Sequence, residues 1–125
     1  MAEPELSIEL VLDEADYPAS QPITLTAKLT IRNWSADPVV LAFPSSQQYD
    51  LEIHNDQGDV VYSWSKGQAF SQSTTELQIQ YEKEFSITAP AGSLPPGKYV
   101  AQAWLTVEGP PRAYSASARF HVMSM

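Results

Sequence analysis

Few residues of this chain are of the types that carry out chemistry, and their spacing does not favour catalysis. The sequence has no cysteine and only two histidines, His54 and His121. Thiol catalysis, disulfide bonds and thiolate metal sites are therefore excluded. The sequence contains no serine nucleophile elbow, zinc-protease motif, phosphate-binding glycine loop or dinucleotide fingerprint. It predicts a protein that is not an enzyme and uses no cofactor.

Two groups of side chains could hold a metal ion, but a solvated surface explains both more simply. His54 shares a strand face with Asp50 and Glu52, because residues at i, i+2 and i+4 point the same way. Residues 13–16 carry three carboxylates, without the spacing or the glycine of an EF-hand loop. Alternating charges are ordinary on a half-exposed strand. We therefore expect no metal site, and we expect His121 to be solvated.

The three tryptophans of the chain favour a binding function over catalysis. Trp64 has the inward parity of its strand and is predicted to pack in the core. Trp104 faces the side opposite Tyr99, where it could anchor a partner, stack on a sugar ring or be covered by residues 82–84. Trp34 lies in a turn. A carbohydrate-binding β-sandwich that uses Trp104 or Trp34 is therefore one open, weaker interpretation.

The segments that must position these residues all have the pattern of strands. Apolar and polar residues alternate with a period of two, most clearly from 23 to 32, and no window shows helical spacing over three turns. The chain is predicted to form an all-β fold, an immunoglobulin-like antiparallel two-sheet β-sandwich of about 7–9 strands with no disulfide, as one domain over 1–125. Residues 77–87 could be one bulged strand or two short ones. The predicted strands are 6–12, 23–32, 39–43, 49–54, 60–64, 77–87, 99–107 and 114–122.

Polar and proline-rich segments separate the strands. Residues 13–18 are predicted to be a solvated connection, and residues 90–97 a second break. The motif Leu94-x-Pro-Gly97-x-Tyr99 resembles the start of the penultimate strand in immunoglobulin-like folds. There a tyrosine hydroxyl bonds back to the backbone a few residues upstream. The resemblance implies that Tyr99 closes the loop before it.

The charge of the chain restricts its partners. A formal net charge of -8 argues against binding to nucleic acid or to an anionic membrane surface, which would repel the protein. No apolar stretch is long enough for a membrane helix, and residues 1–10 lack a basic region followed by an apolar run. We expect a cytoplasmic protein. Asn33-Trp34-Ser35 matches a glycosylation acceptor pattern, which we interpret as a polar strand end.

The hairpin from 43 to 70 carries a more specific signal. Its residues read Phe43-x-Ser45-x-Gln47-x-Tyr49-Asp50, then Asp56-Gln-Gly58, Trp64-Ser65 and Phe70-x-Gln72. This pattern of residues resembles the BsuPI-type intracellular proteinase inhibitor family, and the resemblance extends from about residue 29 to residue 105. The resemblance implies an immunoglobulin-like fold and inhibition of an intracellular serine protease of the subtilisin type. The family often has Gly where Ser46 stands and Trp where Tyr62 stands.

An inhibitor needs a rigid, exposed, extended loop that a protease cleft can grip. The segment from Ser65 to Thr75 is long and lies inside the family block, so it is the favoured binding loop. The alternative loop is 109–113, which two prolines stiffen. Trp64, Tyr99 and Tyr49 are expected to be structural. The candidate contact residues are Lys66, Gln68, Phe70 and Gln72 in the favoured loop, and Pro110, Pro111 and Arg112 in the alternative.

A rival interpretation keeps the fold and changes the partner. An immunoglobulin-like domain can bind a protein that is not a protease, or can pair edge to edge into a homodimer. In that case the partner is still a protein, and changes in the loop would not affect self-association.

Overall fold

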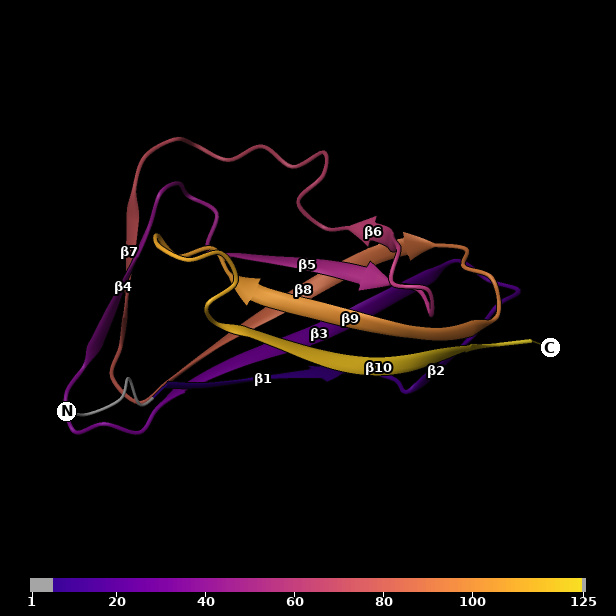
Figure 1. Cartoon of the computed structure of the whole chain (residues 1–125), viewed down its shortest axis with the longest axis horizontal. Helices are drawn as coiled ribbons and strands as arrows, with labels where there is room; N and C mark the ends of the chain where they lie inside the picture. Colours follow the sequence, from indigo (N-terminus) through magenta and orange to yellow (C-terminus); the bar gives the residue numbers. More distant parts are fainter. Residues whose placement is uncertain (1–5, 125) are drawn as a thin grey trace.

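Alternation of apolar and polar residues becomes extended structure throughout the chain. A computed structural model describes residues 6–124, and within them every regular element is a strand (Figure 1). With no helix in this range, there is none that could traverse a lipid bilayer. The ten strands are β1 (Leu6–Leu12), β2 (Asp16–Pro18), β3 (Ile23–Asn33), β4 (Val39–Phe43), β5 (Tyr49–His54), β6 (Val60–Ser63), β7 (Thr75–Ile79), β8 (Glu82–Gly92), β9 (Gly97–Leu105) and β10 (Ser115–Met123).

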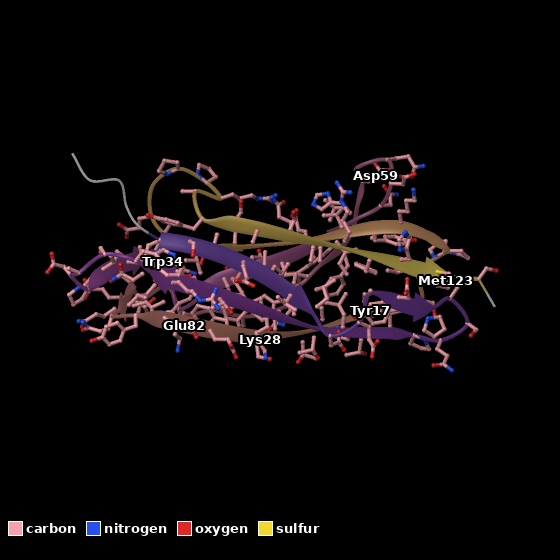
Figure 2. All side chains as sticks on the ribbon, turned by 90° about the horizontal axis from the view of Figure 1, so that it is seen from below. Tyr17, Lys28, Trp34, Asp59, Glu82 and Met123 are labelled. Carbon is pink, nitrogen blue, oxygen red and sulfur yellow. The ribbon has the colours of Figure 1, made fainter. Side chains whose placement is uncertain are left out.

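Two of the sheets pack face to face and confirm the predicted all-β sandwich. The first has three strands in the order β1-β3-β8, and the second has five in the order β2-β10-β9-β5-β6. Figure 2 shows the two layers from the side, with β10 above β1. A third sheet contains only β4 and β7. The β4–β7 pair continues the β3–β8 pair beyond a bend, and strong twist and bending can divide one long ribbon into two sheets. The alternation of apolar and polar residues does not show where a sheet bends.

The core lies between the inward rows of the two larger sheets. Every second residue of β3 is buried, as the strict alternation predicts for a half-buried strand. Buried alanines of β3, β8 and β9 are register partners of large buried side chains, as in Ala27 with Ile87 and Ala101 with Ile53, so small and large residues alternate across the core. The largest fully buried side chains are Phe43, Phe120, Leu25, Leu29, Ile31, Leu51, Ile53, Ile79, Ile87 and Leu105.

The segment after β1 is exposed from 13 to 16, as expected of a solvated connection, but its end corrects the expectation of a purely antiparallel fold without a strand here. Residues 16–18 form β2, which pairs in parallel with the end of β10. The chain crosses here from one sheet to the other and arrives beside β10 in the same direction. The Tyr17 hydroxyl donates to Asp13 Oδ1 at 2.6 Å, which fixes the crossover. Burial, with this bond, raises the pKa of Tyr17, so the hydroxyl stays a donor.

The end of β8 is a second correction. Residues 90–92 continue the strand, and Pro90 is the register partner of Thr24. Proline is tolerated here because β8 is an edge strand, whose outer backbone groups need no ladder partner. The turn is therefore confined to residues 93–96.

A sharp bend separates β8 from β7 and β3 from β4 (Figure 1). The open question about residues 77–87 is thereby settled in favour of two strands. Asn33 is 8% exposed and holds the bend. Its Nδ2 donates to the Asp37 carbonyl at 2.8 Å and the Ile79 carbonyl at 3.0 Å, and its Oδ1 accepts the Ser35 amide at 2.9 Å. The side-chain amide of Asn33 is thus hydrogen-bonded inside the fold, which agrees with the interpretation of Asn33-Trp34-Ser35 as a polar strand end.

Candidate functional site

The loop between β6 and β7, residues 64–74, is held at its first residues by the start of β5. Asp50 Oδ2 accepts the Ser65 hydroxyl at 2.7 Å, and Asp50 Oδ1 accepts the Ser65 amide at 3.2 Å. The Trp64 amide also donates to the Leu51 carbonyl at 2.8 Å. The family resemblance rests partly on Tyr49-Asp50 and Trp64-Ser65, and the structure brings these two pairs together. They close one end of the β6–β7 loop.

Aromatic rings fasten the same loop from within. The Tyr49 ring lies 4.9 Å from the Phe85 ring and 4.9 Å from the Trp64 ring, and Trp64 lies 6.0 Å from Phe70, centroid to centroid. Tyr49, Trp64 and Phe70 are each partly buried. Phe70 therefore packs on Trp64 and does not project as a free anchor. Trp64 packs against the core just beyond β6, and its burial is partial.

The far end of the β6–β7 loop is fixed to the segment between β4 and β5. The Ser46 amide donates to the Ser71 carbonyl at 3.0 Å, and the Ser71 amide donates to Ser46 Oγ at 2.9 Å. The Thr75 hydroxyl donates to the Ser45 carbonyl at 2.8 Å. Ser46 stands where the family often has Gly, so here an additional side-chain bond ties the loop down.

Between these attachments the tip of the β6–β7 loop is exposed. Lys66, Gln68 and Gln72 all face solvent. Gly67 has φ +86°, and the Gln68 amide donates to the Ser65 carbonyl at 3.0 Å, so a tight turn presents the tip. Three of the four residues expected to touch a partner are accessible. The fourth, Phe70, supports them from below.

The loop between β9 and β10, residues 106–114, lies differently. Pro110 and Pro111 are exposed, but Arg112 folds back over the five-stranded sheet. Its Nη1 donates to Gln102 Oε1 at 2.9 Å and its Nη2 to Glu52 Oε1 at 3.1 Å. Arg112 has φ +56°, in the left-handed region. Arg112, the one cationic side chain of this loop, is therefore already engaged in contacts within the protein.

The same arginine decides the environment of Trp104. The guanidinium carbon of Arg112 lies 3.8 Å from the centroid of the Trp104 ring, and Trp104 is 8% exposed. The ring is thus covered by Arg112 and not by residues 82–84, and it offers no platform for a sugar. Trp34 is 68% exposed, but its indole nitrogen donates to Ser7 Oγ at 2.9 Å.

The row of polar side chains on one face of β5, Asp50, Glu52 and His54, contacts other residues of the protein. Asp50 bonds Ser65, and Glu52 binds Arg112. His54 Nε2 lies 3.2 Å from Glu52 Oε1 without the alignment of a hydrogen bond. Among residues 6–124, no three His, Asp or Glu side chains gather as a metal site would require. The structure thus brings the row together as a support for loops.

Tyr99 lies where the resemblance to immunoglobulin-like folds implies. Its hydroxyl donates to the Pro95 carbonyl at 2.6 Å and closes the turn at 93–96. Burial raises the pKa of Tyr99. Its ring stacks on Phe120 at 5.5 Å, so the bond joins the turn to the core.

Comparison with known proteins identifies a family for most of the chain. The family model described as "BsuPI: Intracellular proteinase inhibitor" matches residues 10–110. A search of curated proteins gives no match.

Solved structures of low sequence identity share the fold. A cycloisomaltooligosaccharide glucanotransferase of Paenibacillus has a TM-score of 0.57 at 14% identity, over 90% of this chain and 13% of that chain. Spo0M, a sporulation control protein of Bacillus subtilis, has 0.55 at 11% identity, over 96% and 49%. The CARDB domain of a Pyrococcus furiosus protein has 0.51 at 14% identity, over 96% and 89%. This chain spans a small part of the first protein and about half of the second, and the likeness shows the fold alone.

Proposed function

The chain belongs to the BsuPI family of intracellular proteinase inhibitors, and from that membership we propose that it inhibits an intracellular serine protease of the subtilisin type through the β6–β7 loop. The protein acts as a binder and not as an enzyme. The observation that carries the choice of loop is its construction, with both ends fastened to the sandwich and the tip free.

Fastened ends lower the entropic cost of binding. A flexible loop loses conformational freedom when a protease cleft grips it, whereas a loop already held in shape loses less. Ser65 is bonded to Asp50 and Ser71 to Ser46, so about five residues between them are constrained from both sides. Phe70 on Trp64 adds a third attachment inside the span.

The same attachments should make the loop resistant to cleavage. If the protease attacked a peptide bond between Ser65 and Ser71, both new chain ends would stay bonded to the sandwich. The released amine would remain at high effective concentration beside the acyl-enzyme and would favour re-formation of the bond. An ordinary substrate loop would instead let its ends separate.

The exposed tip supplies the contacts. Lys66 and Gln68 present a cation and an amide to the cleft, and Gln72 extends the surface beyond Phe70. Phe70 and Trp64 act as positioning residues, because their rings are partly buried under the tip. The target protease should therefore present polar or acidic groups near the position that receives Lys66.

The test is a titration of a subtilisin-type intracellular protease with the protein from nanomolar to micromolar. We expect saturable inhibition that the double variant Lys66→Ala, Gln68→Ala weakens at least tenfold, with an unchanged melting temperature. Lys28→Ala is the matched control, because Lys28 is an exposed lysine on the outer face of β3. Absence of inhibition across the range, or rapid cleavage at the tip, would contradict the proposal.

One observation favours a second candidate, self-association. β6 is an edge strand of the five-stranded sheet, and its Val60 and Val61 are 51% and 38% exposed. Unpaired backbone groups beside exposed valines suit pairing with a second copy. A concentration series in size-exclusion chromatography with light scattering, on the parent protein and on Val61→Lys, tests it. A monomer at every concentration would exclude this candidate.

A further inference from the structure

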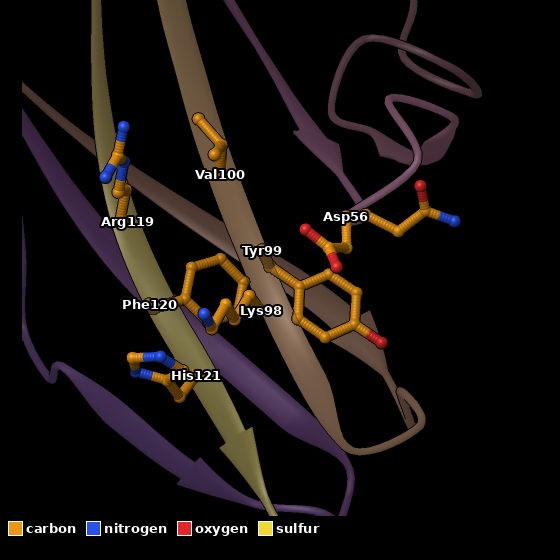
Figure 3. Close-up of a pocket in the computed structure, with 8 residues that line it drawn as sticks. Asp56, Lys98, Tyr99, Val100, Arg119, Phe120 and His121 are labelled. Carbon is orange, nitrogen blue, oxygen red and sulfur yellow. The ribbon is translucent and has the colours of Figure 1, made fainter.

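A cavity of about 550 Å³ lies on the outer face of the five-stranded sheet, where β9 begins and β10 ends (Figure 3). It is separate from the β6–β7 loop. Lys98 stands at the Gly97 end of β9. The β6–β7 loop is bonded through Ser65 to Asp50, whose register partner is Trp104 at the other end of β9. The residues that line the cavity are Asn55, Asp56, Lys98, Tyr99, Val100, Arg119, Phe120 and His121.

The strand register brings three basic side chains to this cavity. Lys98 is the direct partner of His121, and Val100 is the direct partner of Arg119. Direct partners have Cβ atoms about 5 Å apart, and diagonal neighbours are within reach of long side chains. Lys98, Arg119 and His121 therefore all line the hollow. In Figure 3 Lys98 and His121 lie near each other, and the Arg119 side chain points away from them along β10.

Two of these cations have no partner among the described residues. Within 6–124, neither Lys98 nor Arg119 makes a salt bridge or a side-chain hydrogen bond. Asp56 is the single carboxylate among the eight lining residues, and His121 Nδ1 lies 3.6 Å from Asp16 Oδ1.

The concentration of charge is unusual for this chain. The protein has 7 Lys and Arg against 15 Asp and Glu. Of the basic residues, Arg32 and Arg112 are paired with glutamates, whereas Lys98 and Arg119 line a cavity without such a partner. A concave surface focuses such charge and raises the local concentration of anions.

The floor of the cavity is apolar. Val100 points outward between the two cations, and the inward aromatic residues Tyr99 and Phe120 complete the lining. The side chain of Asn55 lies on the wall, beside the turn that follows β5. A cationic rim over an apolar floor fits a ligand with an anionic group on an organic body.

We propose that this cavity binds the phosphate monoester of a small organic molecule. The phosphate lies beside Lys98 and His121, where the exposed Arg119 side chain reaches it by turning toward them, and the organic part rests on Val100. Arginine offers a planar pair of donors that matches phosphate oxygens, and lysine adds a mobile point charge. A dianion balances this set of cations better than a single carboxylate. The site is independent of proteinase inhibition.

The experiment measures binding of phenyl phosphate to the full chain by NMR chemical shifts and by calorimetry, at low ionic strength. We expect saturable binding, with shifts confined to the amides of β9, β10 and the turn after β5. Lys98→Ala and Arg119→Ala should each weaken the affinity about tenfold, the loss expected for one charge-assisted contact. Both residues are exposed, so the variants should keep the parent melting temperature.

Matched probes decide between the parts of the proposal. Lys66→Ala removes a lysine from another surface and should bind phenyl phosphate as the parent does. Benzyl alcohol, which lacks the phosphate, should not bind, and inorganic phosphate should bind more weakly than phenyl phosphate because it leaves the apolar floor uncovered. No saturation at millimolar phenyl phosphate, or equal losses in Lys66→Ala and Lys98→Ala, would overturn the site. Unchanged proteinase inhibition in Lys98→Ala would support its independence.

Discussion

The β6–β7 loop and the β9–β10 loop are both exposed connections of the kind that inhibitors use, yet they differ in which side chains the sandwich leaves free. The first is fastened at its ends, Ser65 and Ser71, and its tip is free. The second is also fastened at its ends, where the Thr106 amide donates to the Gln48 carbonyl and the Leu105 amide to the Tyr114 carbonyl. In addition its Arg112 side chain is engaged by Glu52 and Trp104. What distinguishes the two loops is their cationic side chain, since Arg112 is engaged by the sheet whereas Lys66 makes no salt bridge within residues 6–124.

Proline content is a poor guide to this distinction. Pro110 and Pro111 stiffen the β9–β10 loop, as an inhibitor would require. The stiffness also directs the chain so that Arg112, with φ +56°, reaches back over the sheet. The strain of a left-handed arginine, of order 1 kcal/mol, is offset by its two hydrogen bonds and its contact with an aromatic ring.

The largest effect is expected for Trp64→Ala, which removes the ring that supports the β6–β7 loop from within. Trp64 contacts both Tyr49 and Phe70, so its removal should cost about 3 kcal/mol of unfolding free energy, the low end for a buried aromatic. The β6–β7 loop should lose its inner support, and inhibition should fall with it. Urea denaturation with the inhibition assay measures both. Full inhibition by a destabilised variant would show that the loop does not depend on this ring.

A smaller loss is expected for Phe70→Ala. The ring is partly buried on Trp64, so about 1.5 kcal/mol of stability should be lost, half of the range for a fully buried aromatic. Inhibition should weaken because the tip becomes mobile. Amide hydrogen exchange of residues 66–72 checks this cause. Phe70→Leu, which keeps an apolar contact, should restore part of both properties.

Arg112→Ala tests the other loop. Its salt bridge is partly exposed and is worth little by itself, and with the aromatic contact the expected loss is about 1 kcal/mol. Trp104 should become solvated, which would shift its fluorescence to longer wavelength in a background of Trp34→Phe and Trp64→Phe. Inhibition by the single variant Arg112→Ala, which keeps Trp64, should remain at the parent level. A loss of inhibition without a spectral shift would reverse the roles that we assign to the two loops.

The smallest effect is expected for Ser46→Ala. It removes the bond from the Ser71 amide to Ser46 Oγ but leaves the backbone bond between the same residues, so about 0.5 kcal/mol should be lost. A modest weakening of inhibition with unchanged secondary structure would show that the side-chain bond adds rigidity at the loop's far end. Lys28→Ala is the neutral comparison.

Much of the fold could be predicted from the sequence because alternation is a local property. Strands β1, β3, β5 and β10 follow the apolar pattern within a residue or two, and burial of every second residue in β3 is what that pattern requires. Pairing across the sandwich is not local. The parallel contact of β2 with β10 joins residues about a hundred positions apart, and nothing in the short segment 16–18 indicates its partner.

The site was predictable to a lesser degree. Aromatic and polar residues around Tyr49, Trp64 and Ser65 were recognisable as a group through the family resemblance, and that group closes one end of the β6–β7 loop. The roles of Phe70 and Arg112 were not visible, because both depend on what lies beneath the side chain. The unpaired cations Lys98 and Arg119 become neighbours only through the register of β9 and β10.

By itself the sequence determined the strand pattern, the absence of disulfides and thiol chemistry, the acidic surface and the membership of a family, since these depend on residue types and short spacings. The tertiary structure decided which loop is free, which tryptophan is covered and where the basic residues meet. The physical reason is that exposure and electrostatic pairing are set by neighbours distant in the chain. Packing of the two sheets brings those neighbours together.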